Sequence, residues 1–474
     1  MKKFFIKTLE SILNDTIFRI LLIIFLSSII WISFFRNSNL WYDEFYTIKI
    51  IDNNIKDIIS ITANDVHPPL YYLLLKIYTL IFGTGLNTLK IFSIIPLVLI
   101  LVLNELEVRK LFGKHIANTF VIIFLSSSVV MQYAIEIRMY SWSMLFLYGM
   151  TLYAIKYYQK KDALSIILMT TFSILGIYTH YYVLLSAIVL YLVMILYNVK
   201  DFYKLLISGL INLICYLPWI TILYNQIIQV KQDFWIPEIT ASTILHYPYY
   251  LFTLGKFTNI YLIFIALIII LTFTFILKKE FNYKKEILIC FITFLATCII
   301  GITISILVKP VFHVRYASIS IVSCMILLLS ISIGNIKSNK IRIIISILFI
   351  YFGIISYSYR MLLEFDFSKE YIDTVNKYIN NNDAILFTSD VDQSIVISYY
   401  FENYNYYTLK TYDNSPFNYI KDFNDDIFNQ YEKVFIILFN NTYYNNDKYL
   451  LEYIDNMNLG DWCIFNIYQI KEKN

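Results

Sequence analysis

Two adjacent carboxylates in an aromatic setting are the residues of this chain best suited to chemistry. Asp43 and Glu44 stand within the segment Leu40–Tyr46, which reads LWYDEFY. Aromatic neighbours shield a carboxylate from water and raise its basicity, which suits a general base. The pair can therefore supply a general base, and Glu44 can instead orient either an acceptor or the backbone. The competing interpretation is a solvated loop or a structural cap with two ordinary acids.

Further polar residues stand at the ends of apolar runs. His67 precedes two prolines, which fix an extended entry into the apolar segment 68–83. The others at such ends are Glu136, Arg138, His180, Arg315 and Tyr316. A guanidinium can hold a phosphate through two hydrogen bonds and stabilise it as it departs, and a tyrosine hydroxyl can donate to it. Besides binding phosphate, each arginine could be an interfacial anchor whose charge reaches the lipid headgroups. Each histidine could have only a structural role.

The elements that must position these residues are membrane helices. The chain has 474 residues, of which 58% are apolar and only 15% charged, and its mean hydropathy is +0.62. A soluble domain has about 25% charged residues, and about 20 apolar residues span a bilayer as a helix. Eleven apolar runs are candidates, at 17–35, 87–106, 115–132, 139–158, 163–179, 182–198, 203–223, 259–278, 286–308, 316–334 and 340–358. We predict a polytopic α-helical membrane protein with about eleven spans.

Loop charge predicts which side of the membrane each candidate residue faces. The segment 68–83 is short, opens with prolines and carries Lys76. If it lies along the outer interface, the six loops on one side are all short and basic, as cytoplasmic loops are. These loops contain Lys2, Lys3 and Lys7, then the residues near 109–114, 156–161, 200–204, 278–285 and 337–342. The N-terminus is then cytoplasmic, and every candidate site residue is extracytoplasmic.

The composition changes near residue 363, where a transmembrane domain, 1–362, gives way to a polar tail, 363–474. Two β-rich runs, Ala384–Thr388 and Val434–Phe439, and a closing run, Trp462–Ile470, predict strands. Helical patterns occur at 369–381, 391–402 and 444–457. We expect a small extracytoplasmic α/β domain. The five cysteines form no CxxC or Cys/His cluster, so the sequence indicates neither a disulfide framework nor a zinc site.

The motifs LWYDEFYT, HPPLYYLLLKIY, QYAIEIRMYS, THYY and HVRYAS follow one another in this order. With them the chain resembles the GT-C superfamily of glycosyltransferases, and within it the protein-mannosyltransferase-like branch, which includes glycosyltransferase family 39 and the aminoarabinose lipid A transferases. The resemblance extends over roughly residues 15–360. No single motif is specific, but HPP downstream of an outer-loop Asp-Glu and upstream of QxxxExRMY is specific as a set.

The resemblance implies an activity at the plasma membrane. Relatives take a sugar from a polyprenyl-phosphate carrier at the outer face and transfer it, with inversion, to a protein hydroxyl, a lipid or a glycan. It implies that Asp43, in the first outer loop (36–86), is the base and that His67 faces the cleft. Aminoarabinose-type relatives bind a divalent metal through an acid just before the HPP motif. Here Val66 stands at that position and Asp65 one residue earlier, so a metal is possible but not indicated.

Two other classes of function stay open at this point. A transporter or flippase for lipid-linked sugars would show Gly or Pro breaks and charges within its spans. Here the clear breaks are Pro96 and Pro218, and the ionisable residues gather at helix ends. A polysaccharide polymerase or ligase is also polytopic, but an Asp-Glu followed by HPP in the first outer loop points away from it. The partners we expect are a polyprenyl-phosphate sugar, an acceptor and membrane lipids, and no nucleic acid.

Overall fold

The chain forms two compact units in the computed structural model, which describes residues 15–35, 39–232, 236, 238–277, 281–363, 368–389, 392–401, 403–410, 415–417, 419–440, 448–458 and 464–472. The first, here called the helical unit, comprises Met1–Phe35 and Asp65–Leu363. The second, here called the sheet unit, comprises Arg36–Asn64 and Glu364–Asn474. The segment 36–86 is therefore divided, because its first part clusters with the C-terminal residues.

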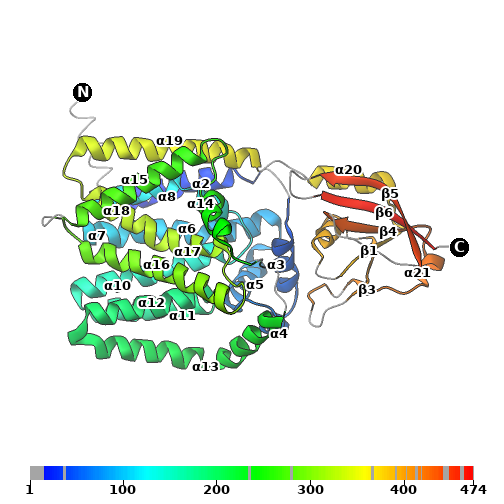
Figure 1. Ribbon diagram of the computed structural model, residues 1–474, viewed down its shortest axis with the longest axis horizontal. Coiled ribbons are helices and arrows are strands. Elements are labelled where there is room, and N and C mark those ends of the chain that lie inside the picture. The colour runs from blue at the N-terminus through cyan, green and yellow to red at the C-terminus, as the bar shows by residue number, and fades with distance from the viewer. Residues whose placement is uncertain are drawn as a thin grey trace. The chain divides into compact units, whose positions relative to one another are not determined.

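All eleven apolar runs are helical in the structure, and most of these helices run side by side in the helical unit (Figure 1). The first part of the unit contains α2 Thr16–Ile32, α5 Leu70–Phe82, α6 Leu86–Leu103, η1 Asn104–Val108, α7 Arg109–Phe112, α8 Lys114–Ser126, α9 Ser128–Tyr133, α10 Tyr140–Lys160, α11 Ala163–Ile177 and α12 Tyr181–Tyr197. The second part contains η2 Val199–Asp201, α13 Phe202–Gln232, α14 Ala241–Leu251, α15 Thr258–Ile276, α16 Lys284–Leu307, α17 Val314–Ser320, η3 Ile321–Met325, α18 Ile326–Gly334 and α19 Asn339–Leu363.

Length and apolar composition make this an integral membrane protein, as the sequence predicts. Among the described residues, six helical stretches are long and apolar enough to cross a membrane: Leu86–Phe112, Val199–Gln229, Gly255–Thr274, Lys284–Leu307, Val314–Gly334 and Asn339–Leu363. Other apolar helices are shorter, and α5, from the segment 68–83, has 13 residues. The number of crossings and the sidedness of the termini stay predictions.

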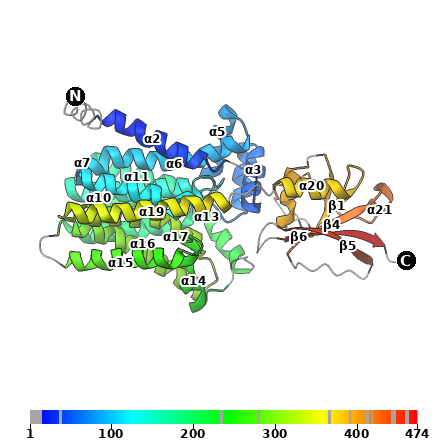
Figure 2. The same cartoon turned by 90° about the horizontal axis from the view of Figure 1, so that it is seen from above.

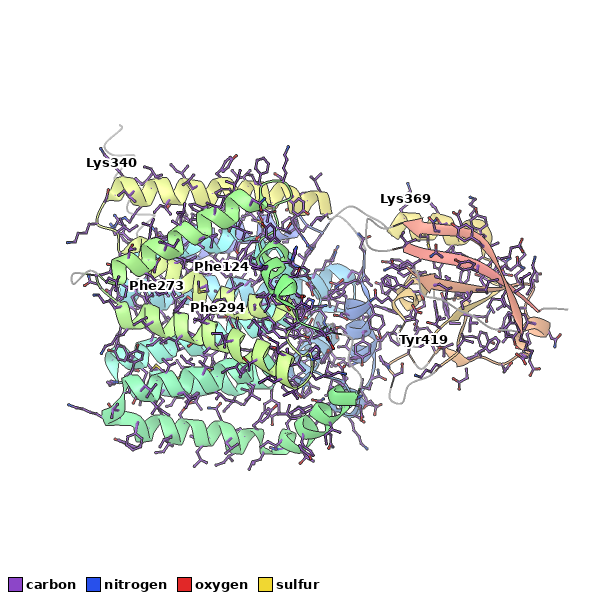
Figure 3. All side chains as sticks on the ribbon, in the orientation of Figure 1. Phe124, Phe273, Phe294, Lys340, Lys369 and Tyr419 are labelled. Carbon is purple, nitrogen blue, oxygen red and sulfur yellow. The ribbon has the colours of Figure 1, made fainter. Side chains whose placement is uncertain are left out.

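Close packing around α10 holds the helical unit together. A Cβ at Gly149 of α10 would lie 2.6 Å from the ring of Phe172, so glycine is what lets α11 approach α10 this closely. Hydroxyl groups also link neighbouring helices, as they commonly do where water is absent. The Ser323 hydroxyl of η3 donates to the Met144 carbonyl of α10 at 2.8 Å. Large rings such as Phe124, labelled in Figure 3, fill the interior. The ends of these helices are thereby fixed in position.

The helices of this unit are long relative to the segments that join them, as Figure 2 shows for α6, α10 and α19. The connection between α9 and α10 has six residues, 134–139, and the connection between α11 and α12 has three, 178–180. Short connections between packed helices leave little freedom at the turns. Residues in these turns are therefore well suited to form a rigid site.

The sheet unit is built on a six-stranded sheet in the order β3-β2-β1-β4-β6-β5. Its elements are α3 Tyr42–Asp52, α4 Ile55–Ala63, α20 Ser368–Tyr378, β1 Ala384–Phe387, η4 Gln393–Tyr399, β2 Asn405–Thr408, β3 Lys421–Asp422, α21 Ile427–Gln430, β4 Val434–Phe439, β5 Tyr449–Asn458 and β6 Ile464–Glu472. Strand β1 pairs in parallel with β2 and β4, and β6 pairs antiparallel with β4 and β5. The expected α/β domain is confirmed.

One predicted element of this unit is wrong, because the helix expected at 444–457 is strand β5 over its described part. Tyr453 lies opposite Tyr468 and Asp455 opposite Ile467, so Ile454 is the extra residue of a β-bulge. The bulge shifts the alternation of apolar residues, and the shifted pattern looks helical. The pattern at 391–402 gives the 3-10 helix η4, and the strands β2 and β3, of four and two residues, were not predicted.

Candidate active site

Two histidines expected at the site from distant segments lie side by side. The ring centroids of His67 and His180 are 5.4 Å apart, and both side chains are buried. The contact follows from the chain path, because the Leu70 amide at the start of α5 donates to the Tyr178 carbonyl at the end of α11 at 3.0 Å. The HPP motif is thus fixed beside the THYY turn.

Helix N-termini converge around these histidines. His180 is the N-cap of α12, and its Nδ1 accepts from the Tyr182 amide at 3.1 Å. Tyr140 begins α10, and Tyr316 lies in the first turn of the helix that runs through α17 to α18. The Tyr140 and Tyr316 rings lie 6.0 and 4.9 Å from the His180 ring. Because each helix N-terminus carries partial positive charge, this end of the unit favours an anion.

Two arginines add full positive charge to this cluster. Arg138 is only 4% exposed, and its Nη1 donates to the Tyr72 hydroxyl at 3.4 Å. Arg315 donates from Nε to Nδ1 of His313 at 3.1 Å. Both guanidinium charges act on both His67 and His180. The structure therefore brings together the predicted residues from the start of α5, the segment before α10, the turn before α12 and the start of α17.

Glu136 lies in the same segment as Arg138, outside any helix. Helix α9 ends at Tyr133, and the Arg138 amide donates to the Glu136 carbonyl at 2.8 Å in a tight turn. The same carbonyl accepts from the Ser93 hydroxyl of α6 at 2.6 Å. The backbone around Glu136 and Arg138 is thus held in place, and the rule that helical residues two apart face different ways does not apply to them.

Burial and the arginines keep the three histidines neutral. Burial lowers the pKa of His67 well below 6.5, and Arg138, His180 and Arg315 lower it further. Burial, with Arg138 and Arg315, lowers the pKa of His180 to about 3. Burial, with Arg315, lowers the pKa of His313 to about 3. At neutral pH the positive charge of this cluster therefore resides on the arginines.

The neutral state of His180 leaves one donor unsatisfied. Its Nδ1 accepts a hydrogen bond, so its proton is on Nε2. Nε2 is buried and has no hydrogen-bonding partner among the described residues, although His180 is only 2% exposed. A buried donor without an acceptor costs about 1–3 kcal/mol. A ligand with an anionic oxygen would satisfy this donor, and the charges of Arg138 and Arg315, which act on His180, would attract such a ligand.

We expect the neutral histidines to make stability depend on pH. In the unfolded chain each has a pKa near 6.5, so below pH 6.5 the unfolded state binds more protons than the folded state. Stability should then fall as the pH falls from about 6.5 towards 3, by up to about 1.4 kcal/mol per pH unit for each histidine. Melting temperatures of detergent-purified wild type and His180→Gln between pH 7.5 and 5 test this. The variant should show the shallower dependence, and equal slopes would contradict the account.

The two carboxylates belong to the sheet unit, where they form the first turn of α3. Glu44 is 7% exposed, and its Oε2 accepts from the Trp41 amide at 3.4 Å, so it contacts the backbone at the helix start. Asp43 is partly exposed. The Thr47 hydroxyl donates to the Asp43 carbonyl at 2.8 Å and supports the first turn. The positive end of the helix dipole favours a carboxylate at both positions.

Three buried residues of the helical unit were not singled out in the sequence. Lys90 of α6 is 3% exposed, and its Nζ lies 5.9 Å from the centre of the Phe35 ring. It stands inside a predicted span, where a buried ionisable residue marks a functional site by default. That rule would single out Lys90. It was missed because the segment 87–106 was predicted as a span from its many apolar residues. Tyr72 and Tyr140 are two among 43 tyrosines and could not be distinguished from the rest.

Among the described residues, the side chains do not gather into the kind of metal site that the resemblance allows. In the described part of the chain, no group of three His, Cys, Asp or Glu side chains lies close enough to hold a metal ion. His67 and His180 are neighbours, but the guanidinium charges of Arg138 and Arg315 act on both of them and would repel a metal ion. The cluster is suited to an anion.

Comparisons with known proteins agree with this architecture. Residues 66–222 match a family model described as dolichyl-phosphate-mannose-protein mannosyltransferase. The matched segment contains His67, Arg138 and His180, whereas Arg315 and the sheet unit lie outside it. No curated protein matches the chain.

Two solved structures of ArnT from Cupriavidus metallidurans share the fold. The apo structure matches with a TM-score of 0.63 at 8% identity, over 94% of this chain and 97% of that chain. The structure bound to undecaprenyl phosphate matches with a TM-score of 0.58 at 10% identity, over the same shares. The matched lengths include the C-terminal domain as well as the helices. Residues 66–222, which contain His67, Arg138 and His180, thus resemble a mannosyltransferase family, and the chain as a whole shares the fold of ArnT.

Proposed function

We propose that this protein is an inverting glycosyltransferase that moves a sugar from a polyprenyl-phosphate carrier to an acceptor at the outer face of the membrane. The observation that carries the proposal is the cluster of two arginines, Arg138 and Arg315, with the buried and unsatisfied Nε2–H group of His180. Similarity in fold to an ArnT that was crystallised with undecaprenyl phosphate supports a lipid phosphate as the anion.

The cluster supplies what a departing phosphate needs. As the bond between the anomeric carbon and the phosphate oxygen breaks, the phosphate gains negative charge. The two guanidinium groups can each offer paired donors to its oxygens, and His180 offers a third donor that is already desolvated. Donors fixed in advance by the packed helix ends cost no reorganisation during the reaction. Tyr316, beside His180, is a further hydroxyl near this position, and His67 closes the cluster from the side of α5.

We assign the base to Asp43, as the family resemblance implies. The Asp43 carboxylate takes the proton of the acceptor hydroxyl, whose oxygen forms a bond to the anomeric carbon. The bond from that carbon to the phosphate oxygen breaks at the same time, and the phosphate leaves with the electron pair. Attack from the face opposite the leaving phosphate inverts the configuration. Asp43 lies on the first turn of α3 and is partly exposed, so an acceptor can reach it. Glu44 instead accepts a hydrogen bond from the Trp41 amide at the start of the helix.

Membrane geometry is consistent with a lipid-linked donor. The polyprenyl chain would lie between helices, with its phosphate at the outer interface, where the loop charges predict that the arginine cluster lies. Glu136, in the fixed turn next to Arg138, is proposed to orient that guanidinium. The acceptor is a protein hydroxyl, a lipid or a glycan, and the described residues favour none of the three.

Release of free polyprenyl phosphate from a small panel of radiolabelled polyprenyl-phosphate sugars tests this proposal. Purified wild-type protein would be incubated with each donor, and crude cell envelope would serve as the source of acceptor. We expect release with at least one donor, and it should depend on the envelope fraction. Binding of the donors without any release would contradict the proposal and favour a transport function.

A further inference from the structure

The C-terminal part of the chain holds the helix that carries the proposed base. Helix α3 and residues 364–474 cluster into one compact unit, although a predicted membrane domain separates them in the sequence. Phe45 of α3 is completely buried. Its ring packs edge-on against that of Tyr399, with centroids 5.9 Å apart, and lies tilted against that of Phe417, with centroids 5.4 Å apart.

Phe417 contacts one whole face of α3. Its ring lies 6.2 Å from that of Tyr42, 5.4 Å from that of Phe45 and 6.0 Å from that of Tyr46. Residues three and four apart share a helix face, so these three rings form a single surface. The Tyr42 and Tyr46 rings also stack on each other at 5.9 Å. The Phe417 side chain is itself only 2% exposed, so its ring is closely packed.

This contact determines the direction in which Asp43 points. Successive residues on a helix are about 100° apart, so Asp43 projects beside the face that Phe417 holds. Rotation of α3 about its axis would move the carboxylate and would also break all three ring contacts. The start of the helix is fixed separately, because the Leu40 amide donates to the Tyr400 hydroxyl at 3.1 Å.

A cation–π contact fixes the other end of α3. Lys49 Nζ lies 5.5 Å from the centre of the Phe45 ring and 5.0 Å from that of Tyr419, which is labelled in Figure 3. Tyr419 is anchored in turn by a 2.6 Å hydrogen bond between its hydroxyl and that of Ser398. Helix α3 is therefore held along its length by side chains of the C-terminal residues.

We propose that Phe417 is a positioning residue for Asp43, so that the C-terminal residues form part of the catalytic apparatus. The inference rests on the proposed function, because it assigns Asp43 the role of the base. Phe417 need not touch the donor or the acceptor, since it acts through the orientation of α3. A small displacement of a reacting group lowers the rate strongly while binding elsewhere is unchanged.

Steady-state kinetics of Phe417→Ala and Phe417→Tyr test this inference. We expect the alanine variant to lose on the order of 10- to 100-fold in kcat, with little change in donor KM or in affinity for polyprenyl phosphate. The tyrosine variant should retain most of the activity because it restores the ring. The matched control is Phe423→Ala, since Phe423 packs against Phe428 and Tyr449 in the same unit. An unchanged kcat in Phe417→Ala would overturn the inference, as would an equal loss in the control.

Two further measurements separate positioning from general stability. If Phe417 acts through Asp43, adding Phe417→Ala to Asp43→Asn should lower kcat no further, whereas the full additional loss would overturn the inference. Deuterium uptake by the α3 amides should rise in Phe417→Ala and not in Phe423→Ala. Unchanged uptake would also overturn it. Deuterium uptake needs no turnover, so it tests the role of Phe417 even if wild type releases no polyprenyl phosphate. Absence of that release would contradict the proposed function and not the packing of α3.

Discussion

Replacing Asp43 with Asn is expected to lower kcat by about 10²- to 10⁴-fold, the range that a positioned general base contributes. The amide has nearly the shape of the carboxylate but cannot take the proton of the acceptor hydroxyl. Donor binding should change little, because the proposed phosphate site is formed by residues of the helical unit. The measurement is release of polyprenyl phosphate, with the affinity for the donor determined in parallel.

Asp52→Asn is the matched control for this variant. Asp52 ends the same helix, and its carboxylate lies 3.5 Å from Lys49 Nζ, with half of the side chain exposed. The control removes one negative charge from α3 and should retain nearly wild-type turnover. If Asp43→Asn released polyprenyl phosphate as fast as wild type, the enzyme class would stand, but Asp43 would not be the base.

Replacing Arg315 with Met is expected to have the second large effect. It should weaken the binding of polyprenyl phosphate and leave the general base in place. A hydrogen bond to a charged group contributes about 1.5–3 kcal/mol, which corresponds to a loss of about 10- to 150-fold in affinity for polyprenyl phosphate. The affinity of Arg315→Lys should lie between those of Arg315→Met and wild type, because an ammonium group keeps the charge but not the paired donors. The measurement is the Kd for polyprenyl phosphate in detergent.

Arg342→Met provides the control for a lost guanidinium. Arg342 donates from Nη1 to the Gly334 and Ile336 carbonyls in the connection between α18 and α19. This connection lies at the end of α18, whereas Arg315 lies at the start of the same continuous helix, 314–334. The control should keep the wild-type Kd. Equal weakening in both variants would mean that the effect of Arg315→Met is general destabilisation.

Much of the fold could be predicted from the sequence because a bilayer constrains composition so strongly. The eleven apolar runs, read by length alone, all coincide with helices. The histidines and arginines at their ends could be singled out for the same reason, since a charge at the end of an apolar run is conspicuous. What could not be predicted was which ends meet. The contact between His67 and His180 depends on the hydrogen bond from Leu70 to Tyr178, which joins two connections distant in the chain.

Contacts between distant segments also explain the remaining differences. The sequence placed Glu136 and Arg138 at the end of an apolar run and left open whether the helix reaches them; the structure shows that the helix ends at Tyr133. Lys90 was hidden by the apolar residues around it. The bulge at Ile454 is set by pairing with β6 and cannot be read from β5 alone. The contact of Phe417 with α3 joins the two ends of the chain, and no local pattern near residue 417 distinguishes that ring from the other phenylalanines.

If Arg138, Arg315 and His180 form a site for a lipid phosphate, the wild-type protein should distinguish two ligands that differ only in that group. Polyprenyl phosphate and the corresponding polyprenol share the same hydrocarbon chain and differ in the phosphate. We expect polyprenyl phosphate to bind at least tenfold more tightly, and we expect Arg315→Met to remove most of that difference. Equal affinities of wild type for the phosphate and the alcohol would show that the cluster does not recognise the phosphate and would contradict the account.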